Sequence, residues 1–220
     1  MIKVLPSTNP CPETELLKYV KSLEDLNIEY LHCDVMDGVF VENQCLSFEK
    51  LREIRNNCNI LLDVHLMCDN VFDRVKQFAT LKPNILTIHY EAVKSTKELI
   101  KSLQFIRSKD ILVGLSIKPN TPIEIIERLL DQIDLVLIMS VEPGKSGQLF
   151  IPESLEKISK TKDLIGDRRV IIEVDGGINE DNYKDVINSG AEFLVMGSAF
   201  YNAKDKKKLL NKIDKHYKFN

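Results

Sequence analysis

Two patterns of apolar residues alternate along the chain. Short runs rich in branched apolar side chains, such as residues 2–5 and 85–89, are typical of buried strands. Longer charged runs, such as residues 13–26, carry leucine and valine at helical spacing. The other expected strands are residues 30–35, 60–66, 111–117, 135–141, 169–174 and 193–196, and the other expected helices are 47–56, 71–81, 95–107, 121–130, 152–164, 180–189 and 204–217. Ser47 and Ser95 stand where helix N-caps are expected.

Strands that alternate regularly with helices predict a parallel sheet. The expected elements form eight strand–helix units in 220 residues, which predicts an α/β protein with a single-domain (β/α)8 TIM barrel over residues 1–220. An open, doubly wound sheet is the alternative that this pattern leaves.

Composition and charge narrow the classes of function. The chain is 44% hydrophobic and 29% charged, with a net charge of -3, so we expect neither a nucleic-acid surface nor an anionic-membrane surface. It begins without a signal-peptide pattern and has no apolar run near the roughly 20 residues that span a bilayer, which predicts a soluble, cytoplasmic protein. The five cysteines are expected to be free thiols.

Polar side chains gather at the ends of the expected strands, where a barrel of this type has its active site. Because alternate strand residues share a face, the set expected to point inward is His32, Asp34, Met36, His65, Met67, His89, Met139 and Asp175. The nitrogen and oxygen donors of His32, Asp34, His65 and Asp175 suit one divalent metal ion, Zn, Fe, Mn or Co. Asp63, His89, Glu91 and Glu173 either orient those ligands or satisfy polar strand ends.

Glycine-rich loops follow three of the late strands, at residues 144–147, 175–177 and 197–198. Barrel enzymes often bind phosphate with the loops after the last two strands, where glycine lets backbone N–H groups approach an anion closely. Each glycine pair alone is also consistent with an ordinary turn. Together they favour a phosphate site. The lysine-rich segment 204–208 is expected to be a solvated helix face.

Five segments together resemble the ribulose-phosphate 3-epimerase family; they are residues 32–43, 63–67, 139–144, 174–178 and 196–200. The resemblance implies one divalent metal ion per subunit on His32, Asp34, His65 and Asp175, with Asp34 and Asp175 as the catalytic acid/base pair. Its implied contacts to substrate and phosphate are Ser7, His65, Gly144, Gly147, Gly176, Gly177, Gly197 and Ser198, and its implied pocket-lining methionines are Met36, Met67 and Met139. It also implies a homo-oligomer, either a dimer or a hexamer.

Two loops depart from the family pattern. Residues 8–12 replace the usual sequence after Ser7, and Lys145 and Ser146 replace a phenylalanine and a glycine. Lys145 and Ser146 are still expected to lie at the substrate, and Lys145 either contacts the phosphate or faces water.

The reaction that the resemblance implies interconverts D-ribulose 5-phosphate and D-xylulose 5-phosphate at C3 through an enediolate, a step of the pentose phosphate pathway. The nearest alternative is a 3-epimerase of a ketohexose 6-phosphate such as allulose 6-phosphate. A sugar-phosphate decarboxylase would carry Asp-x-Lys-x-x-Asp on the third strand, where this chain has Asp63-Val64-His65. A non-catalytic phosphosugar-binding barrel is the remaining alternative.

Overall fold

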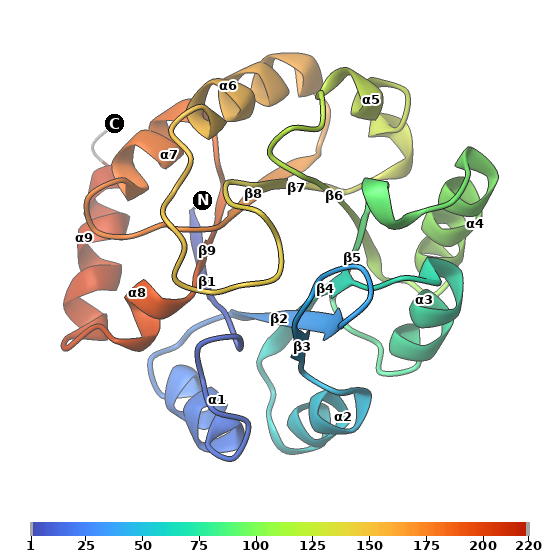
Figure 1. The fold of residues 1–220 in the computed structure, drawn as a ribbon. Helices are drawn as coiled ribbons and strands as arrows, with labels where there is room; N and C mark the ends of the chain where they lie inside the picture. The colour runs from blue at the N-terminus through green and yellow to red at the C-terminus, as the bar shows by residue number, and fades with distance from the viewer. Residues whose placement is uncertain (1, 219–220) are drawn as a thin grey trace.

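The protein forms a ring of parallel strands surrounded by helices, and this computed structural model describes residues 2–218 (Figure 1). The parallel strands are β1 (Lys3–Pro6), β2 (Tyr30–Asp37), β4 (Leu61–Met67), β5 (Ile85–His89), β6 (Leu112–Ile117), β7 (Leu135–Met139), β8 (Ile171–Asp175) and β9 (Phe193–Met196). Their order is β1-β9-β8-β7-β6-β5-β4-β2. A parallel bridge between Ser7 and His32 joins the two ends, and the Thr8 N–H donates to the His32 carbonyl at 2.9 Å. The expected TIM barrel is confirmed.

Helices cover the outer face of this ring (Figure 1). They are α1 (Leu16–Glu24), α2 (Phe48–Asn57), α3 (Val71–Ala79), α4 (Thr96–Arg107), α5 (Glu124–Glu127), α6 (Ser154–Ile165), α7 (Tyr183–Ser189), α8 (Ser198–Tyr201) and α9 (Lys206–Lys218), with 3-10 turns η1 (Tyr90–Ala92) and η2 (Leu130–Gln132). The two expected serine caps are confirmed: Ser47 accepts from the Lys50 N–H and Ser95 from the Glu98 N–H, each at 3.2 Å. Among residues 2–218, no helix has the length and apolar character needed to cross a bilayer.

The expected helix over residues 121–130 is wrong, because only α5 and η2 form there. Lys157 on α6 donates through Nζ to the carbonyls of Lys118, Pro119 and Thr121, at 2.6, 3.1 and 2.7 Å. The Thr121 carbonyl is therefore bonded by a side chain rather than by a helical N–H. The sequence also gave no sign of β3 (Gln44–Cys45), a short antiparallel strand beside the end of β2.

Buried apolar side chains form two main layers and a small third cluster of Met36, Val41 and Met67. The larger layer lies between strands and helices and includes Cys33, Val35 and Leu66. A smaller cluster fills the barrel interior and includes Leu5, Leu137 and Phe193. Alternation along β2 sends Cys33 outward, as predicted, and sends its neighbours inward. Several polar side chains also lie in the interior without exposure: His32, Asp63, His65, Thr87, His89, Ser116 and Glu173. Burial of such groups is costly unless they are paired, so their partners identify the site.

Candidate active site

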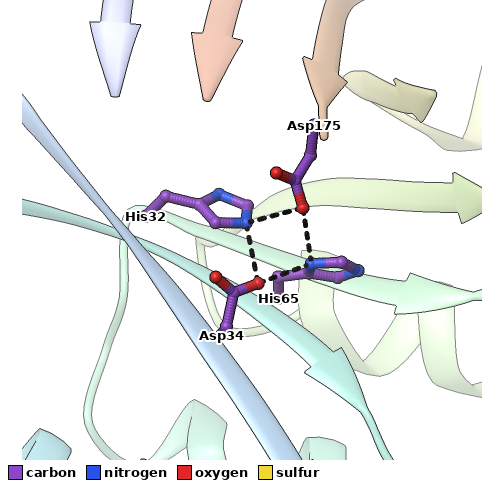
Figure 2. Close-up of side chains that lie close together, drawn as sticks. All are labelled: His32, Asp34, His65 and Asp175. Atoms are coloured by element: carbon purple, nitrogen blue, oxygen red, sulfur yellow. Dashed lines mark hydrogen bonds and ion pairs between the residues drawn. The ribbon is translucent and has the colours of Figure 1, made fainter. Parts of the chain in front are cut away.

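Four side chains converge at the carboxyl end of the barrel. His32 and Asp34 come from β2, His65 from β4 and Asp175 from the last residue of β8 (Figure 2). One donor atom from each lies within 4.8 Å of the others. Asp34 Oδ1 is 3.3 Å from His32 Nε2 and 3.2 Å from His65 Nδ1, and Asp175 Oδ2 is 3.8 and 3.9 Å from the same two nitrogens. The structure thus brings together the four residues that the sequence selected.

The two nitrogens of His32 have different surroundings. Its Nδ1 lies 2.5 Å from Asp63 Oδ2, on the neighbouring strand β4, and carboxylate oxygens accept, so the proton lies on Nδ1. Its Nε2 is buried, faces the centre and makes no hydrogen bond. A buried acceptor without a partner is uncommon in proteins, and a divalent cation would satisfy it. The donor set and this nitrogen both fit a metal ion with mixed histidine and carboxylate ligands.

The two aspartates of the centre ionise differently. Burial alone would raise the pKa of Asp34, but electrostatic attraction to the His32 and His65 rings outweighs it and holds that pKa well below its ordinary value. Burial, together with the negative charge of Asp34, raises the pKa of Asp175 to about 6. Two facing carboxylates with separated pKa values are the arrangement that acid/base chemistry requires.

A second acidic group lies deeper in the barrel. Glu173 Oε1 is 3.4 Å from His32 Nδ1, and both Glu173 and Asp63 are fully buried. Burial, followed by the charge of Asp63, raises the pKa of Glu173 well above its ordinary value. One of this pair therefore carries its proton while the other accepts from His32. Asp63 contacts a residue of the centre, as expected of a group that orients a ligand.

A cavity of about 240 Å³ opens above the centre. This is below the roughly 300–1,000 Å³ of sites for drug-sized ligands, so it suits a small molecule. Of the selected residues, those that line it are Ser7, Asp34, Met36, Met67, Met139, Gly144, Lys145, Ser146, Gly147, Asp175, Gly176, Gly177, Gly197 and Ser198. His32 and His65 lie beneath the wall, fully buried, so His65 is placed at the centre rather than on the cavity surface.

Sequence reasoning missed several residues of the cavity wall, among them Asn9, Glu142, Gln148, Leu149 and Asn179. They belong to the loops after β1, β7 and β8. Their closeness in sequence to Ser7, Gly144 and Gly177 could have indicated that they line the same cavity. The Asn9 N–H, for example, donates to Ser7 Oγ at 3.0 Å.

Two loops meet over the mouth of the cavity. Asn43, after β2, donates through Nδ2 to the Gly144 carbonyl at 2.7 Å, and Lys145 Nζ lies 3.5 Å from Glu42 Oε2. The loop from β7 to α6, drawn in yellow, extends over the strands in Figure 1. The Lys145 side chain is 63% exposed, so its ion pair with Glu42 contributes little stability and leaves the cation able to turn toward a ligand.

Gly177 allows the loops after β7 and β8 to pack closely. Its φ is +67°, and a Cβ there would lie 2.4 Å from the Phe150 nitrogen. A side chain at this position would therefore displace the backbone of the neighbouring loop. The positive φ and the close approach of Phe150 together require glycine at this position.

The closed parallel ring, with a polar centre at the carboxyl ends of its strands, defines a TIM-barrel protein of the kind whose active site is built from the loops after the strands. The solved structure of 3-hexulose-6-phosphate synthase from Salmonella typhimurium matches it with a TM-score of 0.70 and 16% identity, covering 98% of each chain. At that identity the likeness concerns the fold alone.

Sequence comparison is more specific. The model of the "Ribulose-phosphate 3 epimerase family" matches residues 3–201. A ribulose-phosphate 3-epimerase from Bacillus subtilis (strain 168) is 38% identical over 216 residues, covering 97% of this chain and 98% of that protein. A chloroplastic ribulose-5-phosphate-3-epimerase from Arabidopsis thaliana is 39% identical over 206 residues, covering 93% of this chain and 73% of that protein. The chain belongs to the ribulose-phosphate 3-epimerase family, and the resemblance stated from its motifs is confirmed.

Proposed function

We propose that the protein is a metal-dependent 3-epimerase that interconverts D-ribulose 5-phosphate and D-xylulose 5-phosphate in the pentose phosphate pathway. Membership of the family supports the class of reaction. The observation that carries the proposal is the pair Asp34 and Asp175, which face one cavity from two strands and share the same histidine nitrogens. Epimerisation needs one proton-transfer group on each face of the reacting carbon, and this pair supplies both.

The reaction begins at C3 of the sugar. The C3 proton is next to the C2 carbonyl, so its removal gives an enediolate. A carboxylate is too weak a base for this step unless the negative charge that develops on oxygen is stabilised. A divalent ion, Zn, Fe, Mn or Co, held by His32, Asp34, His65 and Asp175, would supply that stabilisation as a Lewis acid.

The two aspartates exchange roles with the direction of the reaction. One of them, ionised, accepts the C3 proton on its face, and the other, protonated, returns a proton on the opposite face. Ser7 donates through Oγ to Asp34 Oδ2 at 2.6 Å and so orients that carboxylate. Asp34 Oδ1 remains directed at the histidines.

The rest of the cavity suits a sugar phosphate. Met36, Met67 and Met139 present apolar walls that exclude water from the intermediate without adding charge. We assign the phosphate to the loops after β8 and β9, where Gly177 and Ser198 line the cavity and their backbone N–H groups would serve as donors. Lys145 would leave Glu42 to contact the phosphate. The resemblance further supports a homo-oligomer, a dimer or a hexamer.

Turnover of two substrates tests the proposal. With metal bound, kcat/KM for ribulose 5-phosphate should exceed that for allulose 6-phosphate, with deuterium from solvent appearing at C3 of the product. A preference for allulose 6-phosphate would overturn the assignment of substrate. Release of carbon dioxide from a sugar-phosphate acid, or tight binding of both sugars without exchange at C3, would overturn the assignment of reaction.

A further inference from the structure

A chain of polar groups leads away from the centre, from His65 on β4 through His89 on β5 to Glu91 in the turn η1 that follows β5. His65 Nε2 lies 2.9 Å from His89 Nε2, and His89 Nδ1 lies 3.1 Å from Glu91 Oε2. The rings of His65 and His89 are stacked with centroids 4.9 Å apart. Both histidines are fully buried, and neither His89 nor Glu91 lines the cavity. The contact of these two residues with the centre therefore runs through His65 and not through the substrate.

The hydrogen bonds of Glu91 determine which group donates and which accepts at each step from Glu91 to His65. Its Oε1 accepts from the Lys118 N–H at 2.7 Å and from the Thr121 hydroxyl. Its other oxygen, Oε2, faces His89 Nδ1. A carboxylate oxygen accepts, so His89 carries its proton on Nδ1. A neutral imidazole then has an acceptor at Nε2, and His65 must donate to it from its own Nε2.

This polarity determines what His65 offers to the centre. With its proton on Nε2, the Nδ1 of His65 presents a lone pair toward Asp34 Oδ1 at 3.2 Å and Asp175 Oδ2 at 3.9 Å. Lone pairs that converge in this way repel each other unless a cation lies between them. His32 also presents a lone pair to the centre, from its Nε2. A single group is enough to orient it, because Asp63 accepts directly from its Nδ1.

An aromatic ring packs against His89. The Phe40 ring lies over His89 with centroids 5.0 Å apart, and Lys118 Nζ lies 4.5 Å from the centroid of Phe40. Water therefore cannot readily replace a lost partner of His89. The loop that carries Lys118 and Thr121 is itself held by Lys157, so the end of the chain is anchored.

We infer that His89 and Glu91 are positioning residues that hold His65 in its Nε2–H tautomer, with Nδ1 directed at the metal. This inference rests on the proposed metal centre. It assigns different supports to the two histidine ligands: a carboxylate alone for His32, and an imidazole followed by a carboxylate for His65. Loss of a group that orients a metal-binding histidine typically weakens metal binding about 10–100-fold.

The test uses the whole protein with His89→Phe, which keeps an aromatic ring and removes both nitrogens, and Glu91→Gln, which removes the charge. His216→Gln, on α9 away from the site, is the matched control. Proton–nitrogen spectra of histidine-labelled, metal-free protein report the tautomer of His65, and chelator competition reports the Co²⁺ dissociation constant. We expect Nε2–H in the wild type and the control, loss of this single tautomer in both variants, and a Co²⁺ dissociation constant about 10–100-fold higher in His89→Phe.

Two results would overturn the inference: wild-type protein with its His65 proton on Nδ1, or a folded variant with unchanged tautomer and unchanged Co²⁺ affinity. If His89→Phe does not fold, Glu91→Gln decides by the same two measurements. Wild-type protein that binds no Co²⁺ would instead overturn the proposed metal centre. The spectra of metal-free protein would still report the tautomer of His65, so the positioning role is tested separately.

Discussion

Asp34 and Asp175 reach the same two histidine nitrogens from strands that are not neighbours in the sheet. Asp34 lies on β2 and Asp175 on β8, with β9 and β1 between them. Their oxygens are 3.2 and 3.9 Å from His65 Nδ1 (Figure 2). Because β1 closes the ring against β2, the pair forms only in the closed barrel. Two carboxylates on one centre can therefore approach a bound sugar from two sides.

Replacing either aspartate by asparagine should abolish epimerisation but leave exchange of the C3 proton on one face of the sugar. We expect Asp175→Asn to lower kcat by about 10²–10⁴-fold, the usual contribution of a general acid or base. Asp34 would still exchange the C3 proton of one epimer with solvent, and Asp34→Asn should show the same behaviour with the other epimer. Deuterium incorporation followed by NMR, with metal content matched between proteins, measures this. Near-normal turnover by Asp175→Asn would contradict the role given to it.

Removal of the metal should cost both activity and stability. A ligand that binds the folded protein alone stabilises it by about 2.7 kcal/mol at 100 times its dissociation constant. We expect a chelator to abolish turnover and lower Tm, and Co²⁺ to restore both. In His32→Asn the added metal should raise Tm much less. Full activity in protein shown by elemental analysis to be metal-free would rule out the metal-dependent mechanism.

The barrel and the four converging residues were both predictable from regular patterns along the sequence. The alternation of strands with helices predicted the barrel, and the alternation of side chains along each strand predicted which residues point inward. Period 2 along β2 and β4 directs His32, Asp34 and His65 inward, and parallel strands put their ends at one edge. Contacts made by long side chains were not predictable in this way. Lys157 bonds three carbonyls of a loop more than thirty residues earlier in the chain, among them that of Thr121, where the expected helix was to begin.

Two glycines with positive φ distinguish the effect of backbone strain from the effect of loop packing. Gly166 has φ +57° and, among residues 2–218, no atom within 4 Å of an added Cβ, whereas at Gly177, φ +67°, the Cβ would meet the Phe150 backbone. Both alanine variants should lose about 1–3 kcal/mol of stability from positive-φ strain, and Gly177→Ala should lose more than Gly166→Ala because its Cβ would also displace the Phe150 backbone. Gly177→Ala alone should also raise KM severalfold, because the loops around the proposed phosphate site must move apart. Denaturant unfolding and steady-state kinetics measure the two effects, and equal KM values in both variants would contradict the placement of the phosphate.

Glu91 should make the protein more sensitive to acid. Burial alone would raise its pKa, but hydrogen bonds from His89, Thr121 and the Lys118 backbone outweigh it and lower the pKa from 4.5 to about 2. The folded state then binds fewer protons than the unfolded chain, so this contribution is complete above pH 4.5 and is lost as pH falls toward 2. Between pH 5.5 and 3.5 it should diminish by about 1 kcal/mol. Urea unfolding at the two pH values should show a smaller decrease for Glu91→Gln than for the wild type. Equal decreases would mean that the hydrogen bonds of Glu91 do not favour its charged form, and the direction assigned to the His65–His89–Glu91 chain would lose its basis.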